Sequence, residues 1–156
     1  MFIKIVVVGK TKEASLKSLE RSYLERISRY TRVDLVAVRP ERVPQDQKAS
    51  PALRAEAERI LRKIGEGDFC IVLDNGGREL TSPELTHFLK WHLISGTRRM
   101  VFGTGGPLGR DVVVKKRADL LLSFSKLTFT HQMIRALFRE QLYRAWTLIR
   151  GEKYHK

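Results

Sequence analysis

With 156 residues, 42% of them hydrophobic, the chain is long enough for one domain with its own core, residues 1–156, and too short for two. A formal charge of +13 favours a polyanionic partner, nucleic acid first, and residues 98–156 hold thirteen basic residues against four acidic ones. One cysteine excludes an internal disulfide, and the short apolar start is neither a membrane span nor a signal peptide, so we expect a soluble cytoplasmic protein.

Predicted strands and helices alternate from one end of the chain to the other. Apolar runs predict strands at 2–8, 33–38, 69–74, 98–102 and 119–124, and residues 40–48, with two prolines, a loop. Amphipathic spacing predicts helices at about 16–30, 51–64, 82–95 and 131–150, the third after a turn at 75–77 and a capping box from Thr81 to Glu84. This order predicts an α/β fold, a mainly parallel sheet with helices on both faces and ligands at the carboxyl ends of the strands.

The segment GTGGPLG, residues 103–109, lets a backbone come close to a ligand. It does not match the dinucleotide-binding fingerprint, because the position that requires the third glycine is Leu108. It does not match a P-loop either, because Arg110 and Asp111 follow Gly109 in place of Lys and Ser or Thr. A phosphate ligand is therefore disfavoured.

The final helix carries an apolar stripe that covers half of its circumference. A stripe of this width is typical either of a central core helix or of a helix buried on two sides, by its own core and by a second copy of the chain. Arg135 lies inside the stripe, Arg139 at its edge and Arg144 on the opposite side. We expect the arginine inside the stripe to have a dedicated partner, either a carboxylate or an RNA phosphate.

Metal and nucleophilic sites are disfavoured. His87 and His92 are five residues apart, on different faces of a helix, and no cluster of Cys or carboxylates accompanies them. Cys70 lies within an apolar strand, where we expect a buried thiol. The tail EKYHK ends in side chains that can stack on a base and exchange a proton, although a frayed terminus explains the same residues.

The strings LSFSKLTFTHQMIRALFREQLYRAW (122–146) and EKYHK (152–156), with VVVGK near the start and IVLD at 71–74, resemble the SPOUT-class methyltransferases that methylate N3 of a pseudouridine in large-subunit (23S) ribosomal RNA. The similarity covers essentially the whole chain. It implies a SPOUT-type α/β fold with a C-terminal trefoil knot, a homodimer built on the knot helices, S-adenosyl-L-methionine as cofactor, and ribosomal RNA or the ribosome as partner. Periodicity alone predicts an open sheet, because true knots are rare.

Carried over by motif position, the resemblance implies cofactor contacts at Leu73, Gly105, Leu122, Ser123, Phe124, Ser125, Lys126 and Leu127. The chain departs from the family at Thr104, where Ile often precedes the paired glycines. Because S-adenosylmethionine has no phosphate, the missing phosphate-binding residues are expected. The cofactor is also cationic, so we assign the basic field to RNA.

Transfer to N3 requires loss of the N3–H proton, for which a general base is needed. The candidates are His155 and then His131, while Tyr154 can stack on or hydrogen-bond the base, and Arg144 can hold a phosphate or stabilise the developing anion. In a dimer the tail can reach the cofactor site of the partner. No metal and no membrane enter this scheme.

Two other functions remain open on sequence alone. One is a non-catalytic RNA-binding, ribosome-associated factor of the same fold, which would keep the basic C-terminal third and bind no cofactor. The other is a nucleotide-dependent enzyme with an unusual glycine loop. The basic residues can also simply face water.

Overall fold

The computed structural model describes residues 1–41, 50–104 and 112–154 of the chain. Its centre is a five-stranded sheet with the order β2-β1-β4-β3-β5, in which all pairings are parallel. The strands are β1 (Phe2–Val8), β2 (Val33–Val38), β3 (Phe69–Glu79), β4 (Arg99–Thr104) and β5 (Leu120–Ser123). The predicted parallel α/β sheet is confirmed.

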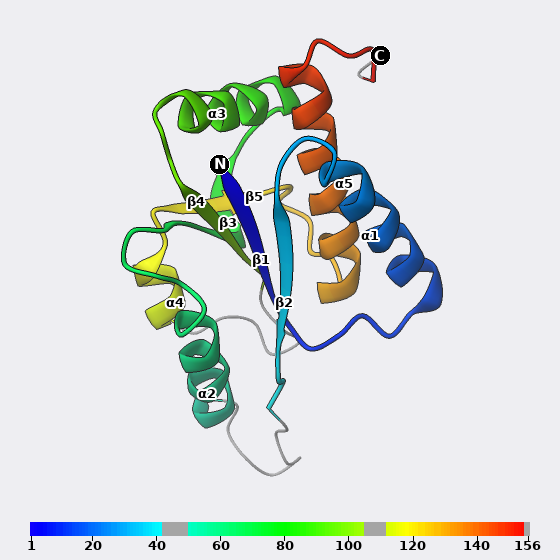
Figure 1. The fold of residues 1–156 in the computed structure, drawn as a ribbon. Helices are drawn as coiled ribbons and strands as arrows, with labels where there is room; N and C mark the ends of the chain where they lie inside the picture. The colour runs from blue at the N-terminus through cyan, green and yellow to red at the C-terminus, as the bar shows by residue number, and fades with distance from the viewer. Residues whose placement is uncertain (42–49, 105–111, 155–156) are drawn as a thin grey trace.

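Helices cover both faces of this sheet (Figure 1). They are α1 (Ala14–Ile27), α2 (Ser50–Leu61), α3 (Ser82–Ile94), α4 (Val112–Arg117) and α5 (His131–Ile149). The first, third and fifth pack on one face, and the second and fourth on the other, because alternate residues of each strand point to opposite sides. In β1, for example, Ile5 and Val7 face α5, whereas Val6 and Val8 face α2 and α4.

Local signals account for several boundaries. Thr81 caps α3 through the predicted capping box: its hydroxyl accepts a hydrogen bond from the Glu84 N–H (3.3 Å), and the Glu84 carboxylate accepts one from the Thr81 N–H (2.8 Å). Thr130 caps α5 by accepting a hydrogen bond from the Met133 N–H. Gly9, which ends β1, has a φ of 73°, a conformation that favours glycine.

Two boundary predictions are wrong. The predicted turn at 75–77 lies within β3, which runs on to Glu79, and Gly103 and Thr104 extend β4 rather than opening the glycine loop. Smaller differences are that α1 ends at Ile27 and α2 at Leu61, ahead of the predicted ends. Most of the loop predicted at 40–48 and the rest of the glycine segment lie outside the described residues. Among the described helices, none is both long and apolar enough to cross a lipid bilayer.

Candidate functional site

Three neighbouring strands bring two of the predicted cofactor contacts together at the carboxyl edge of the sheet. Leu73 of β3 is in register with Thr104 of β4 on one side and with Leu122 of β5 on the other. All three are at most 2% exposed. Gly105, which follows Thr104 in the chain, lies outside the described residues. This edge is where parallel α/β sheets bind their ligands.

Beyond Leu73, β3 bends and pairs with β5 a second time. The register shifts so that Arg78 also lies opposite Leu122. The two backbones approach so closely that a Cβ at Gly77 would lie 2.6 Å from the carbonyl carbon and oxygen of Leu121. Glycine is needed here because the two strands β3 and β5 approach so closely. This explains why a sequence signal typical of a turn lies inside a strand.

The segment after β5, which carries the remaining predicted contacts, is shaped by its own serines. The Ser123 hydroxyl donates to the Ser125 carbonyl (3.0 Å), and the Ser125 hydroxyl accepts from the Leu127 N–H (2.9 Å). Ser123 is buried and Phe124 packs on Phe138 of α5, with ring centroids 6.2 Å apart. Lys126 is exposed, and Leu127 is 73% exposed. The predicted contacts therefore comprise buried residues, such as Leu122 and Ser123, and exposed ones, Lys126 and Leu127.

An ion pair beside this edge was not anticipated from the sequence. Lys115 of α4 lies 2.7 Å from a carboxylate oxygen of Asp74, the residue after Leu73, and the other oxygen accepts the Gly76 N–H at 2.9 Å. The ion pair between Lys115 and Asp74 connects α4 to the carboxyl end of β3. The signal that could have revealed it is an acid directly after a buried strand, in IVLD.

The composition of the edge fits S-adenosylmethionine. Leu73 and Leu122 are apolar, and the buried Thr104 hydroxyl has no hydrogen-bond partner in the described part of the chain. Such a mixture of apolar surface and a few polar atoms is typical of small-molecule sites.

The first turns of α5 hold the loop that follows β1. The Arg135 guanidinium donates to the carbonyls of Val8 and Gly9 and, at 3.3 Å, to the Thr11 hydroxyl. The Gln132 side chain accepts the Lys12 N–H at 2.6 Å. The expected partner of Arg135, a carboxylate or an RNA phosphate, is thus replaced by backbone carbonyls and a hydroxyl. His131 lies at this same end of α5.

His131 is partly buried, and its pKa is lowered by desolvation and by the nearby charges of Arg135 and Lys12. At neutral pH its imidazole is therefore unprotonated, as a general base requires.

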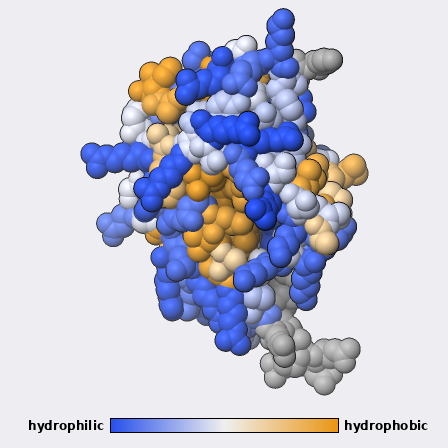
Figure 2. Space-filling view, turned by 45° about the vertical axis from the view of Figure 1, so that its right-hand side comes forward, coloured by the Kyte–Doolittle hydropathy of each residue, from blue (hydrophilic) through white to orange (hydrophobic). Residues whose placement is uncertain are grey.

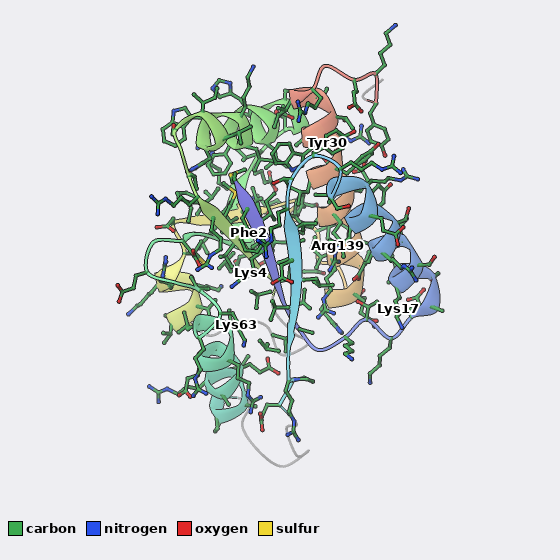
Figure 3. All side chains as sticks on the ribbon, in the orientation of Figure 1. Phe2, Lys4, Lys17, Tyr30, Lys63 and Arg139 are labelled. Atoms are coloured by element: carbon green, nitrogen blue, oxygen red, sulfur yellow. The ribbon has the colours of Figure 1, made fainter. Side chains whose placement is uncertain are left out.

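Arg139 lies in the interior rather than at the edge of the stripe, which corrects the sequence-based placement. It is 0% exposed, and its guanidinium lies 2.9 Å from the carboxylate of Glu20 on α1, which also accepts a hydrogen bond from Thr11 (2.8 Å). Figure 3 shows Arg139 among the side chains between α1 and α5. Burial lowers the pKa of Arg139 to about 10. The helical stripe did not reveal this partner, because Glu20 lies in another element.

The other two catalytic candidates meet at the far end of α5. The Arg144 guanidinium bonds Glu140 (3.0 and 2.6 Å) and lies 5.2 Å from the centroid of the Tyr154 ring. The Tyr154 ring packs edge-on against Tyr143, and burial together with a hydrogen bond to Tyr23 raises its pKa to about 12. His155 lies outside the described residues.

Residues of the tail contact other parts of the chain. The Tyr30 hydroxyl donates to the Glu152 carboxylate at 2.6 Å, and Tyr30 stacks on Trp146 of α5. Tyr30 is labelled near the last turns of α5 in Figure 3. Glu152 and Tyr154, part of the tail for which the sequence left fraying open, therefore make side-chain contacts with the rest of the chain.

One chain thus carries its candidate residues in two separate groups. Helix α5 runs from the carboxyl edge of the sheet, where Arg135 contacts β1, to the opposite edge, where Trp146 contacts Tyr30. The thirteen residue steps from His131 to Arg144 span about 20 Å of helix. The cofactor residues and His131 lie at one end, and Arg144 and Tyr154 at the other.

The remaining histidines and the cysteine have no role at this edge. His92 is buried, 2.9 Å from the Thr97 hydroxyl and packed on Phe69, whereas His87 is exposed. Cys70 is buried, as expected. Within residues 1–41, 50–104 and 112–154, no group of three or more His, Cys, Asp or Glu side chains could hold a metal ion.

A family model described as "Predicted SPOUT methyltransferase" matches residues 1–155. Relatives named "Ribosomal RNA large subunit methyltransferase H" include one from Carboxydothermus hydrogenoformans, 42% identical over 159 positions and 100% of both chains. Another, from Caldicellulosiruptor saccharolyticus, is 41% identical over 154 positions and 99% of both chains.

Two solved structures share the fold. A probable methylase family protein from Haemophilus influenzae has a TM-score of 0.59 at 16% identity, over 99% of this chain and 70% of that one. The tRNA (m1G37) methyltransferase from Aquifex aeolicus has a TM-score of 0.57 at 15% identity, over 100% of this chain and 74% of that one.

Proposed function

Because the chain belongs to the SPOUT methyltransferase family, we propose that it methylates N3 of a pseudouridine in 23S ribosomal RNA, in the cytoplasm and on the assembled ribosome, with S-adenosylmethionine as methyl donor. The observation that carries the proposal is full-length similarity, at 42% identity, to a relative named for methylation of large-subunit ribosomal RNA. The +13 charge supports an RNA substrate.

The methyl donor supplies an electrophilic methyl group on a cationic sulfonium. Leu73 and Leu122 would give the donor apolar contacts. Ser123 fixes the turn of the segment that would lie over the donor. Positioning the reacting atoms in line accounts for about 7–11 kcal/mol of barrier reduction, more than general-base catalysis contributes. The rigid strand ends are therefore the main catalytic contribution of this edge.

Proton removal and charge stabilisation fall to the remaining candidates. His131 is neutral at pH 7 and can accept the N3 proton of the pseudouridine. His155 can do the same if the tail brings its side chain to the pseudouridine. With its pKa at about 12, Tyr154 stays protonated, so it acts as a hydrogen-bond donor or stacking surface and not as a base. Arg144 carries the positive charge that would stabilise a developing anion on the base.

The separation of the two groups of residues supports a homodimer. If two copies pack their α5 helices in opposite directions about a two-fold axis, Arg144 and Tyr154 of one copy approach the cofactor edge of the other. On the side of the molecule that carries α1 and α5, Figure 2 shows an apolar patch bordered by hydrophilic side chains. Exposed apolar residues of α5 and the segment before it are Leu127, Phe129 and Met133.

Complementation tests this arrangement. Arg144→Ala removes the guanidinium that would serve the partner's site. Gly105→Arg places a positive charge at a predicted contact with the cationic donor. Each variant alone should be inactive. When the two are mixed and allowed to exchange subunits, half of the dimers are mixed and each has one intact site, so about a quarter of the wild-type rate should return. No recovery, in subunits shown to exchange, would contradict a site shared between copies.

The proposed reaction itself is tested by mass spectrometry of 23S rRNA from cells with and without the protein. The expected difference is a single methyl group on one pseudouridine, restored when purified protein and S-adenosylmethionine are added to ribosomes from the deficient cells. Identical rRNA from both cells would exclude the activity. A non-catalytic RNA-binding factor would also fail to bind S-adenosylmethionine in calorimetry.

A further inference from the structure

We propose that the Thr104 hydroxyl forms a hydrogen bond to the bound methyl donor, a contact additional to those expected at Leu73, Gly105 and residues 122–127. This inference rests on the proposed function, because it concerns the same cofactor. It assigns a role to the position at which the chain departs from the family pattern.

Thr104 occupies the end of β4 at the centre of the candidate edge. It is in register with Val7 of β1 and Leu73 of β3. Since paired residues of parallel strands point to the same face, its side chain lies in one row with theirs and with Leu122 of β5. Thr104 is therefore the polar member of a row of otherwise apolar side chains at the ligand-binding end of the sheet.

The hydroxyl of Thr104 is unusual because it is buried without a partner. The residue is 1% exposed, and no described atom forms a hydrogen bond with its Oγ1. By contrast, three other hydroxyls form hydrogen bonds: Ser123 with the Ser125 carbonyl, Ser125 with the Leu127 N–H, and Thr11 with Glu20. Buried polar groups are ordinarily paired, because leaving one unpaired destabilises the fold.

Packing does not account for a hydroxyl at this position. Valine has nearly the same shape, would fill the same space beside Val7 and Leu73, and would bury no unpaired polar atom. The polar atom therefore costs stability in the free protein, and a hydrogen bond made on ligand binding offsets that cost. Functional sites are where such local destabilisation is expected.

The donor has the chemistry that fits this position. Its ribose, adenine and amino-acid groups all offer hydrogen-bonding atoms within a molecule that also presents apolar surface to Leu73 and Leu122. Gly105, the next residue in the sequence, is itself a predicted contact. RNA does not suit this position, because Thr104 is 1% exposed and does not lie on the basic surface.

Calorimetry with S-adenosylhomocysteine on Thr104→Val and Thr104→Ser tests the inference, together with thermal unfolding of the free proteins. Loss of one neutral hydrogen bond should raise the Kd of Thr104→Val roughly five- to tenfold. Thr104→Ser, which keeps the hydroxyl, should stay within about twofold of wild type by the same measure. In the absence of ligand, Thr104→Val should unfold at a Tm no lower than wild type, because it removes an unpaired polar atom.

Thr147→Val is the matched control. Thr147 is 0% exposed, but its hydroxyl donates to the Arg144 carbonyl at 2.7 Å. Its replacement should lower the Tm and leave the Kd unchanged.

Two results overturn the role of Thr104 while the proposed cofactor stands. One is wild-type affinity in Thr104→Val, and the other is a fall in its ligand-free Tm like that of Thr147→Val, which would reveal an internal partner. A wild-type protein that binds no S-adenosylhomocysteine would instead overturn the proposed function, and this inference with it.

Discussion

Glu20→Gln is the substitution that tests the buried charge pair between α1 and α5 most directly. It preserves the size of the side chain and its ability to accept the Thr11 hydroxyl, but removes the negative charge 2.9 Å from the Arg139 guanidinium. That guanidinium is 0% exposed, and two of its nitrogens, Nε and Nη2, have no hydrogen-bond partner among the described residues. Water therefore cannot compensate for the lost carboxylate.

The expected effect is large. Removing one partner of a buried ion pair costs about 3–5 kcal/mol, because the other charge stays in a poorly solvated environment. For a chain of this length each kcal/mol lowers the Tm by about 2–4 °C, so Glu20→Gln should lower it by about 6–20 °C. Replacing both partners, in Glu20→Gln combined with Arg139→Met, should restore most of the loss, because an apolar residue of similar volume carries no uncompensated charge.

The assay is thermal and urea unfolding followed by circular dichroism, at one protein concentration because self-association would make the Tm concentration-dependent. Glu25→Gln serves as the control, since Glu25 forms an exposed pair with Arg21, with side chains 63% and 82% exposed. It should change the stability by less than about 1 kcal/mol. A loss below about 1 kcal/mol in Glu20→Gln, or a double variant no more stable than the single one, would refute the reasoning.

Two further predictions follow from the geometry of the edge. Gly77→Ala should lower the free energy of unfolding in urea by about 1–3 kcal/mol, because the new Cβ meets the Leu121 backbone at 2.6 Å. Gly67→Ala, whose Cβ would have no atom within 4 Å, should lower it by less than about 1 kcal/mol. Equal effects of the two substitutions would contradict the close approach of β3 and β5. If His131 is the general base, the rate of methyl transfer to ribosomes should fall as the pH drops below 6.5, because the lowered pKa of His131 keeps its imidazole mainly unprotonated above that pH. A rate that already falls as the pH drops through values at or above 6.5 would exclude that role. So would the same pH dependence in His131→Gln.

Much of the fold could be predicted because it depends on local pattern. The run FIKIVVV is buried on both faces as β1, and the Thr81 to Glu84 capping box begins α3 where expected. Such signals involve residues within one or two turns of each other, so a single sequence contains them in full.

The errors lie where another part of the chain decides the conformation. Residues 75–77 carry a turn signature, but at Gly77 the absence of a side chain serves the close passage of β5, about 45 residues later in the sequence. The pairing of Arg139 with Glu20 joins two helices more than 100 residues apart, and Arg135 binds backbone carbonyls, which no side-chain pattern reveals. The convergence of Leu73 and Leu122 could be predicted, because parallel strands end at a common edge.

Helix α5 carries both groups of candidate residues. Its first turns are fixed to the loop after β1 by Gln132 and Arg135, and its last turns carry Arg144 and the contacts that hold Tyr154. Between these ends, the buried Arg139 pairs with Glu20 of α1, and Phe138 packs on Phe102 of β4. In the two-fold pair of antiparallel α5 helices proposed above, the first turns of each helix would lie at one donor site and its last turns at the other. In the proposed dimer each α5 helix would thus take part in both sites, so that a single element would connect them.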